Sequence, residues 1–339
     1  MKKNNIDQIS VVIPVYNVSA YVVKCVESVL QSTLSNIKVI VVDDCGSDDS
    51  MLKVRQLQRK DSRIQIIKNE VNRGLAFSRN VGLSHVRSKY VAFLDSDDWV
   101  SPDFYEKLYE AIVAEDADIA VGNVLYAYPK KGIYREEWVS HWAFNSGKPL
   151  VASVDDKQNI IYACACWNKL YKTKLFVENN IKFPEGLFVE DVPVTFATTA
   201  FSQRIVLVKD AVHYYRQRED SIMRSISKSR RIFDVFEIYD VCYDWLDKLP
   251  ANVRLVYRQV LDNFQIFNLK SWSTSVCEAD YLEFLQEMGR RFRGIEHVED
   301  NRFITKKTLE IYRDVLKKSS QKKYDIFLFG LIPIGYVFL

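Results

Sequence analysis

The sequence predicts an α/β fold in which a mostly parallel central sheet carries helices on both faces. Short β-branched runs alternate with helical spacings of apolar residues over roughly the first third of the chain, which is typical of such sheets. Acidic residues follow several of these runs, at the strand ends where ligands bind in this architecture. The chain has 339 residues, 48% of them hydrophobic, enough for a sizeable core and more than one domain.

Strands and helices alternate in order along the first third. The expected strands cover residues 9–15, 37–42, 64–67 and 90–94, each a short apolar run rich in β-branched residues. Apolar residues recur at helical spacing between and after them, which predicts helices within 22–30, 51–57, 73–84 and 104–113. This order favours a doubly covered, Rossmann-like sheet.

The pattern changes after residue 118. Residues 118–124, 205–208 and 212–215 predict three further short strands, and residues 126–148 have the composition of an aromatic loop. From about residue 225 the apolar spacing is helical, with candidates at 233–245, 255–269 and 281–292. We therefore expect an α/β domain over residues 8–222, a helical region over 223–323 and an apolar tail over 324–339.

Charge and cysteine content limit the partners. The net charge is only +3, and 11 basic against 5 acidic residues lie between Arg290 and Lys323. This basic zone suggests anionic lipid or another polyanion, or an ordinary solvated helix surface, and we expect no nucleic-acid partner. The six cysteines form no C-x-x-C pair and the first residues are polar, so we expect neither a zinc site nor a signal peptide, and a cytoplasmic location.

The last 14 residues, 326–339, carry no charge and contain Gly330, Pro333 and Gly335. They are too few to span a bilayer, and they follow a lysine-rich stretch. An apolar aromatic segment beside basic residues fits docking at a membrane interface. A terminal hairpin packed against the core is the alternative.

The stretch YVAFLDSDDWV at residues 90–100 places three carboxylates directly after a buried strand. Asp95 and Asp97 are two residues apart, so on an extended segment they point the same way. A hard cation such as Mg²⁺ or Mn²⁺ takes a few carboxylate oxygens and completes its shell with diphosphate oxygens. Taken alone, the pair fits a solvated strand end or an Asx turn equally well.

Five motifs occur together and in order: PVYN at 14–17, VVDDCGSDDS at 41–50, NRGLAFSRNVGL at 72–83, YVAFLDSDDW at 90–99 and FPEGLFVEDV at 183–192. As a set they resemble the family 2 glycosyltransferases of GT-A fold, over roughly residues 8–220. The resemblance implies an inverting enzyme that takes a sugar from a nucleotide-sugar donor and builds bacterial surface polysaccharide, such as capsule, O-antigen or exopolysaccharide.

The resemblance also implies donor-binding residues. Those expected to contact the nucleotide-sugar are Pro14, Tyr16, Asn17, Asp43, Asp44, Arg79, Asp95 and Ser96. Cys45 stands where the family motif has glycine, so the turn after the second strand is expected to differ. Tyr16 could instead be a strand-end core aromatic, and Arg79 could pair with Asp43 or Asp44 without a ligand.

A second group is implied around the diphosphate. Asp97 is expected to be the direct ligand of Mn²⁺ or Mg²⁺, with Asp95 on the ribose or a metal-bound water, and Asp98 is expected to orient the loop or to cap it. Arg216, Arg218 and Ser221 are expected to close over the diphosphate, since arginine holds phosphate bidentately. His213 either completes the metal shell or is a core residue on a strand.

The acid pair Glu190–Asp191 is implied to carry catalysis. Asp191 is expected to be the general base, with Glu190 as the first alternative; the other interpretation is that both acids only decorate a helix N-terminus. Trp167 precedes the pair in a W-x-K-L-Y pattern, where it could stack on an acceptor sugar or pack in the core.

We therefore expect a metal-dependent, inverting enzyme that uses a UDP-sugar and a glycan or polyprenyl-diphosphate-linked acceptor, peripheral at the inner face of the cell membrane. A sugar-1-phosphate nucleotidyltransferase shares the sheet but needs a glycine-rich loop with a basic residue after the first strand, which PVYNVSAYV lacks. A catalytically silent nucleotide-sugar-binding or scaffold subunit is the other alternative. Intact Asp95, Asp97 and Asp191 argue against it.

Overall fold

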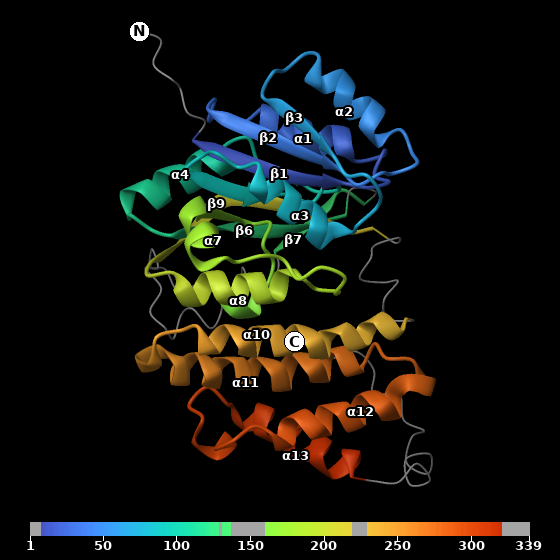
Figure 1. Cartoon of the computed structure of the whole chain (residues 1–339), viewed down its shortest axis with the longest axis vertical. Coiled ribbons are helices and arrows are strands. Elements are labelled where there is room, and N and C mark those ends of the chain that lie inside the picture. The colour runs from blue at the N-terminus through green and yellow to red at the C-terminus, as the bar shows by residue number, and fades with distance from the viewer. Residues whose placement is uncertain (1–7, 129–130, 137–159, 219–228, 321–339) are drawn as a thin grey trace. The chain divides into compact units, whose positions relative to one another are not determined.

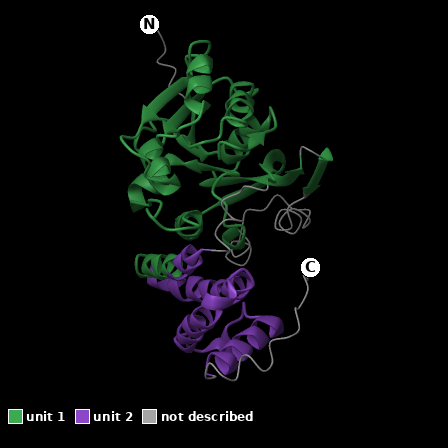
Figure 2. Cartoon of the chain, turned by 90° about the vertical axis from the view of Figure 1, so that its right-hand side faces the viewer, with its two compact units in different colours: residues 1–219, 237–249 green, residues 220–236, 250–339 purple. Residues whose placement is uncertain are grey.

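The computed structural model describes residues 8–128, 131–136, 160–218 and 229–320 (Figure 1). Two compact units divide the chain: residues 1–219 with 237–249, and residues 220–236 with 250–339 (Figure 2). The first unit contains most of the expected α/β domain, and the second contains most of the expected helical region.

The first unit is built on a nine-stranded sheet with the order β3-β2-β1-β4-β8-β6-β9-β5, and β7 pairs with β6. Its first four strands are parallel, as predicted: β1 (Ile9–Val15), β2 (Ile37–Asp43), β3 (Ile64–Lys68) and β4 (Tyr90–Phe93). Val15 lies opposite Asp43, and Val12 lies opposite Phe93. The carboxyl ends of β1, β2 and β4 therefore meet at one edge of the sheet, and the acidic segments after them come together there.

The second half of the sheet is mixed. β6 (Ile119–Tyr128) and β9 (Ile205–Arg216) run parallel to each other. β8 (Lys169–Lys172), β5 (Trp99–Val100) and β7 (Ile133–Glu136) pair antiparallel with their neighbours. Two expectations were wrong here: 205–208 and 212–215 form one strand with a register shift opposite Gly122 and Asn123, and part of the expected loop at 126–148 forms β7. A bulge lets the strand pass through polar residues without ending.

Helices occur where the periodicity predicted them: α1 (Val22–Leu30), α2 (Ser50–Gln58), α3 (Leu75–Ser84) and α4 (Phe104–Ala114). The short α7 (Thr173–Asn179) was not predicted, whereas α8 (Asp191–Phe201) begins at the acid pair as expected. α3 packs very close to the sheet, because a Cβ on Gly82 would overlap the Val12 side chain. That close approach buries Ser78 and Arg79 on the same side of the helix.

The second unit is helical. It contains α11 (Ala251–Ser273), α12 (Glu278–Arg293) and α13 (Lys306–Ser319), while α10 (Asp234–Asp247) crosses the border between the units. α13 was not predicted, because its buried side chains include the small polar Thr308 and Ser319. Part of the basic zone is paired in the structure: Arg313 lies 2.7 Å from Glu299, and Lys318 lies 2.8 Å from Asp314.

No helix in the described ranges combines the length and the apolar character that crossing a bilayer requires. The apolar tail at 324–339 lies outside the described residues, so its interpretation as a membrane-docking segment or a terminal hairpin stays a prediction.

Candidate active site

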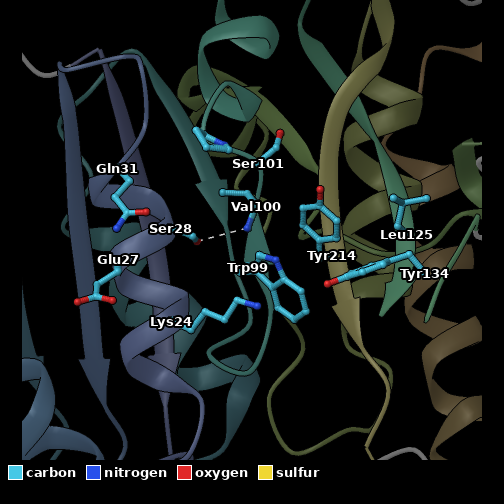
Figure 3. A pocket seen from close by; sticks show the side chains of 11 residues that line it. Lys24, Glu27, Ser28, Gln31, Trp99, Val100, Ser101, Leu125, Tyr134 and Tyr214 are labelled. Atoms are coloured by element: carbon cyan, nitrogen blue, oxygen red, sulfur yellow. Dashed lines mark hydrogen bonds between the residues drawn. The ribbon is translucent and has the colours of Figure 1, made fainter. Parts of the chain in front are cut away.

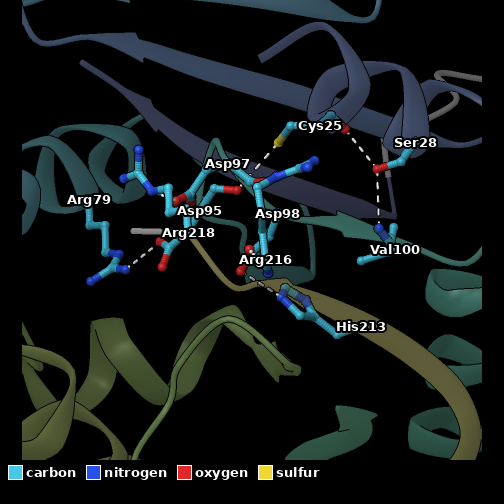
Figure 4. A network of polar contacts seen from close by, with 10 residues as sticks. All are labelled: Cys25, Ser28, Arg79, Asp95, Asp97, Asp98, Val100, His213, Arg216 and Arg218. Atoms are coloured by element: carbon cyan, nitrogen blue, oxygen red, sulfur yellow. Dashed lines mark hydrogen bonds and ion pairs between the residues drawn. The ribbon is translucent and has the colours of Figure 1, made fainter. Parts of the chain in front are cut away.

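A tight turn carries the acidic cluster that follows β4. The Asp98 amide donates to the Asp95 carbonyl at 3.0 Å, which closes the turn. Side-chain exposure falls from 23% at Asp95 and 18% at Asp97 to zero at Asp98. Asp95 and Asp97 therefore offer carboxylate oxygens at the sheet edge, while Asp98 points into the protein (Figure 4).

Asp98 anchors the turn to β9. Its carboxylate accepts a hydrogen bond from the Arg216 amide at 2.7 Å and lies 3.0 Å from His213 Nε2. Burial, with the charge of Asp95, raises the pKa of Asp98 well above its usual range, and burial lowers the pKa of His213 to about 3. The imidazole is therefore neutral. Asp98 orients the loop as expected, and it does so through the backbone of the strand that carries Arg216.

His213 lies between Asp98 and an aromatic stack. Its ring stacks on Trp167 with centroids 4.3 Å apart, and it contacts Phe104 edge-on at 6.2 Å. Its Nδ1 is buried without a hydrogen-bond partner among the described residues. The side chain predicted either to hold metal or to fill the core thus has core packing on its ring faces and Asp98 on Nε2.

Two arginines at the end of β9 cover Asp97. Arg218 Nε lies 2.9 Å from Asp97 Oδ2, and Arg216 Nε donates to the Asp97 carbonyl at 2.6 Å. The Arg216 guanidinium also lies over the rings of Trp99 and Tyr21, at 4.6 and 4.8 Å from their centroids. These cation–π contacts hold the guanidinium at the acidic turn. Ser221, the third predicted member of this loop, lies outside the described residues.

Arg79 bridges two carboxylates that are far apart in the sequence. The side chain comes from α3 and is 2% exposed; Nη2 lies 2.6 Å from Asp95 Oδ1, and Nη1 lies 2.5 Å from Glu190 Oε1. The alternative pairing with Asp43 or Asp44 is not found, because Arg79 is committed to these two partners. A planar guanidinium can hold two carboxylates at once, which an ammonium group does less well.

The acid pair sits where a strained backbone meets a helix start. Val189 has φ +57°, a left-handed conformation that is unfavourable for a β-branched residue. Glu190 then precedes α8, and Asp191 is its first residue. Burial, together with the charge of Glu190, raises the pKa of Asp191 to about 7, although Arg79 acts in the opposite direction. A carboxylate with such a pKa is suited to accept a proton near neutral pH.

Some residues expected at the nucleoside are exposed to solvent, and others hold the loops together. Tyr16 is 48% exposed, so it is not a core aromatic. Pro14 is buried inside β1 opposite Val42. Asn17 has φ +50°, and its Oδ1 accepts from the amide of Ser47 at 2.8 Å. Asn17 therefore joins the loops that follow β1 and β2.

Asp43 and Asp44 accept hydrogen bonds from backbone amides of the loops around them. Asp44 is buried and accepts from the amides of Arg73 and Gly74, both at 2.9 Å, which fixes the start of α3. Asp43 Oδ1 accepts from the Cys45 amide at 3.1 Å, and Asp43 Oδ2 lies 3.6 Å from the exposed Arg55. Asp43 is thus the less committed of the two carboxylates.

Cys45 makes the turn in place of glycine. It takes φ +60° itself, and its thiol donates to the Asn69 carbonyl at 3.0 Å. Gly46 is then required by close approach, since a Cβ there would lie 2.9 Å from both the backbone nitrogen and Oδ1 of Asn17. The turn therefore has a left-handed non-glycine residue at Cys45, and it requires glycine at the next position.

Other residues near the site had weak sequence signals. Ser96 is buried in the acidic turn. Trp167 stacks on Tyr215 as well as on His213, with centroids 5.2 Å apart. Lys169 is fully buried, donates to the Ala163 carbonyl at 3.1 Å, and acts to lower the pKa of Asp191. Only the W-x-K-L-Y pattern marked Trp167 and Lys169, and it did not reveal that the lysine lies near the acid pair.

A separate groove of about 600 Å³ lies beside this cluster, between α1 and the strands β5 and β9 (Figure 3). Lys24, Glu27 and Gln31 line it from α1, opposite Trp99 and Tyr214. Those two rings stack at 5.2 Å and 11°. Trp99 thus forms part of the groove and also supports Arg216 at the acidic turn.

Asp95 and Asp97 could together supply part of the ligand shell of a divalent cation. Burial and the charges of Asp98 and Asp95 raise the pKa of Asp97 to about 7, although Arg218 acts in the opposite direction. Among the described residues, no three His, Cys, Asp or Glu side chains gather as a complete metal site. Mg²⁺ and Mn²⁺ accept such a partial set, because phosphate and water oxygens fill the rest of the shell.

Comparison with known proteins identifies the family. The model of Glycosyl transferase family 2 matches residues 10–178. Glycosyltransferase GlyG of Streptococcus pneumoniae is 30% identical over 285 residues, which cover 79% of this chain and 93% of GlyG. Glycosyltransferase GlyA of the same organism is 32% identical over 64% of this chain, a match that covers only 32% of GlyA.

Solved structures agree on the fold. The crystal structure of Staphylococcus aureus TarS residues 1–349 in complex with UDP-GlcNAc has a TM-score of 0.76 and 21% identity, over 92% of this chain and 88% of that one. A second TarS structure, in complex with UDP, has a TM-score of 0.72. With the parallel strands, the acidic turn and the acid pair at the start of α8, these matches show that the chain belongs to the family 2 glycosyltransferases and has the GT-A fold.

Proposed function

We propose that the chain is an inverting glycosyltransferase that moves a sugar from a UDP-sugar to a hydroxyl of a glycan or polyprenyl-diphosphate-linked acceptor in surface-polysaccharide synthesis. The single observation that carries the proposal is the position of Asp191, a carboxyl group linked to the acidic turn. It begins α8, and Arg79 and Glu190 link the start of that helix to the acidic turn, where Asp95 and Asp97 offer carboxylate oxygens. TarS, which shares the fold, was crystallised with UDP and with UDP-GlcNAc, and this favours a UDP-sugar donor here.

In the proposed reaction, Asp191 accepts the proton of the acceptor hydroxyl while the hydroxyl oxygen bonds to the anomeric carbon. The bond from that carbon to the diphosphate oxygen breaks on the opposite face, so the configuration inverts and UDP leaves. The raised pKa of Asp191, about 7, suits it to take up this proton. A general base of this kind contributes about 10²–10⁴-fold to the rate.

Charge at the diphosphate is the second requirement. Asp97 and Asp95 would hold Mn²⁺ or Mg²⁺, which when bound stabilises negative charge on the departing diphosphate. Arg216 and Arg218 stand beside Asp97 and would bind phosphate oxygens bidentately. His213 is the weaker candidate ligand, since its Nε2 already faces Asp98.

The nucleoside would lie along the loops after β1 and β2. Tyr16 offers an exposed ring, and the carboxylate of Asp43 could accept the uracil N3–H. A peripheral position at the inner membrane face is part of the proposal, because a lipid-linked acceptor is held at the interface and the basic zone is suited to an anionic surface.

UDP release tests the proposal. Purified protein is incubated with Mn²⁺ and a panel of UDP-sugars, beginning with UDP-GlcNAc, with and without a lipid-diphosphate-linked acceptor. Acceptor-dependent UDP release supports a transferase. Nucleotide-sugar binding without any release would favour the alternative, a catalytically silent subunit of a membrane synthesis complex.

A further inference from the structure

The base-bearing segment, residues 183–191, is attached to α3 at both of its ends. At one end Asn80 forms two hydrogen bonds with Phe183: Asn80 Nδ2 donates to the carbonyl at 2.8 Å, and the Phe183 amide donates to Asn80 Oδ1 at 2.9 Å. At the other end Arg79 holds Glu190 at 2.5 Å. Two consecutive residues of one helix thus hold a segment that lies more than a hundred positions further along the chain.

The same arginine also holds the acidic turn. Its second guanidinium nitrogen, Nη2, lies 2.6 Å from Asp95 Oδ1, and the group is buried beneath both partners (Figure 4 shows its contact with Asp95). Its Cζ lies 5.3 Å from the ring centroid of Phe183, so the side chain also packs against the far end of the segment. Buried charges that are each committed to a named partner fix geometry, because leaving either partner unpaired is costly.

We infer that Arg79 is a positioning residue: it sets the start of α8, and with it Asp191, at a fixed place relative to the donor-binding turn. In this account Glu190 is the partner of Arg79 and is not an alternative general base. Asn80 is a second positioning residue at the other end of the segment. The inference rests on the proposed function, since it assigns the base role to Asp191.

This role differs from the one that the family resemblance implies for Arg79, which is contact with the nucleotide. Both outer nitrogens of the guanidinium are already engaged with carboxylates, and the side chain is almost completely buried. A group in this setting acts on the reaction through the residues it holds. Misplacement of a reacting group by about 1 Å costs roughly 100-fold in rate, so a positioning residue has a measurable effect on turnover.

The charged groups around Asp191 come from four parts of the chain. Glu190 precedes it on the chain, Arg79 faces it from α3, Asp95 from the acidic turn and Lys169 from β8. Glu190 acts to raise the pKa of Asp191, and Arg79 acts to lower it. Neutralising the two partners should therefore move the acid limb of the pH profile for transfer in opposite directions.

The experiment compares Arg79→Gln, Glu190→Gln and the double variant in the full chain, with the UDP-sugar that the wild-type protein uses. We expect Arg79→Gln to lower kcat about 100-fold and to shift the acid limb to higher pH. We expect Glu190→Gln to retain measurable transfer, with the limb shifted to lower pH. The affinity for UDP with Mn²⁺ should stay within about threefold in Glu190→Gln. In Arg79→Gln it should fall far less than kcat, because Arg79 also holds Asp95 in the donor-binding turn. The double variant should lose at least about fivefold less than the product of the single losses.

Arg73→Gln is the matched control, because it removes a cation just before α3 that also pairs with the base-bearing segment. Arg73 Nη2 lies 3.5 Å from Glu185 Oε2, and both side chains are about half exposed. An exposed ion pair contributes little, so the kinetics of this variant should match the wild type. Arg79→Lys covers the case in which Arg79→Gln does not fold. It keeps the charge but cannot bridge two carboxylates in the same way, so kcat should fall far more than UDP affinity.

Three results would overturn the inference: UDP affinity that falls in parallel with kcat in the Arg79 variants, complete loss of transfer with no acid limb in Glu190→Gln, or losses that simply multiply in the double variant. The first makes Arg79 a nucleotide ligand, and the second makes Glu190 the base. Absence of transfer in the wild-type protein would instead contradict the proposed function itself.

Discussion

Replacing Asp191 by Asn removes the proposed base and preserves its shape. The amide cannot accept the acceptor's proton, so kcat should fall by about 100-fold or more, the share of the rate that general base catalysis supplies. UDP should bind with unchanged affinity, because in the proposed site other residues hold the cation and the nucleotide. The wild-type kcat should also rise with pH around pH 7, and this rise should be absent in Asp191→Asn.

The size of that pH effect follows from the environment of Asp191. With a pKa of about 7, roughly a tenth of the carboxylate is ionised at pH 6 and nine tenths at pH 8, so kcat should rise about tenfold between these values. Asp97 has a pKa in the same range. The profile is therefore measured at saturating Mn²⁺ and donor, where a bound cation keeps Asp97 ionised.

The same substitution should stabilise the fold. A carboxyl group whose folded pKa is raised above its unfolded value costs folded-state stability. That cost grows as the pH rises from the unfolded to the folded pKa, is fully present above the folded pKa, and disappears below the unfolded pKa. The neutral amide avoids it, and Tm at pH 8 should be higher for Asp191→Asn than for the wild type. Full transfer by Asp191→Asn, with its limb near pH 7 intact, would refute the assignment of the base.

Three further outcomes are expected. Asp97→Asn removes a charged ligand and should nearly abolish turnover, as should excess EDTA added to the wild type. Full activity of the wild type in excess EDTA would contradict the proposed metal dependence. Gly46→Ala should weaken UDP binding and cost about 1–3 kcal/mol of stability, because the new Cβ would lie 2.9 Å from Asn17. An unchanged melting curve with unchanged UDP affinity would show that the loops after β1 and β2 can move apart without cost. Deleting residues 324–339 should release the protein from membranes and spare activity on a short soluble acceptor, whereas aggregation of the truncated protein, with no membrane binding by the full chain, would assign the tail to the core.

The sequence was sufficient for the parts of the fold that depend on local pattern. β1 to β4 and the helices between them follow from apolar runs and helical spacing, and the parallel arrangement brings the ends of β1, β2 and β4 to one edge. The acidic turn and the start of α8 were therefore placed correctly along the chain. The short antiparallel strands β5, β7 and β8 were missed, because two to four residues carry too little pattern to separate them from loops.

Partner choice could not be predicted in the same way. Arg79 was expected to face the nucleotide or to pair with Asp43 or Asp44, whereas the structure pairs it with Asp95 and with Glu190, 111 positions away. Several carboxylates have the same chemistry, and only the packing of α3 at Gly82 decides which of them the buried guanidinium reaches. The left-handed backbone at Cys45 and Val189 likewise could not be predicted, because both residue types rarely adopt it.

The most direct test of the central claim is the anomeric configuration of the product. The wild-type protein is given the α-linked UDP-sugar identified by the donor panel, Mn²⁺ and acceptor, and the new linkage is read from the anomeric proton coupling in an NMR spectrum. Direct attack assisted by Asp191 predicts a β-linked product and equimolar UDP. An α-linked product would contradict the inverting mechanism and the role assigned to Asp191.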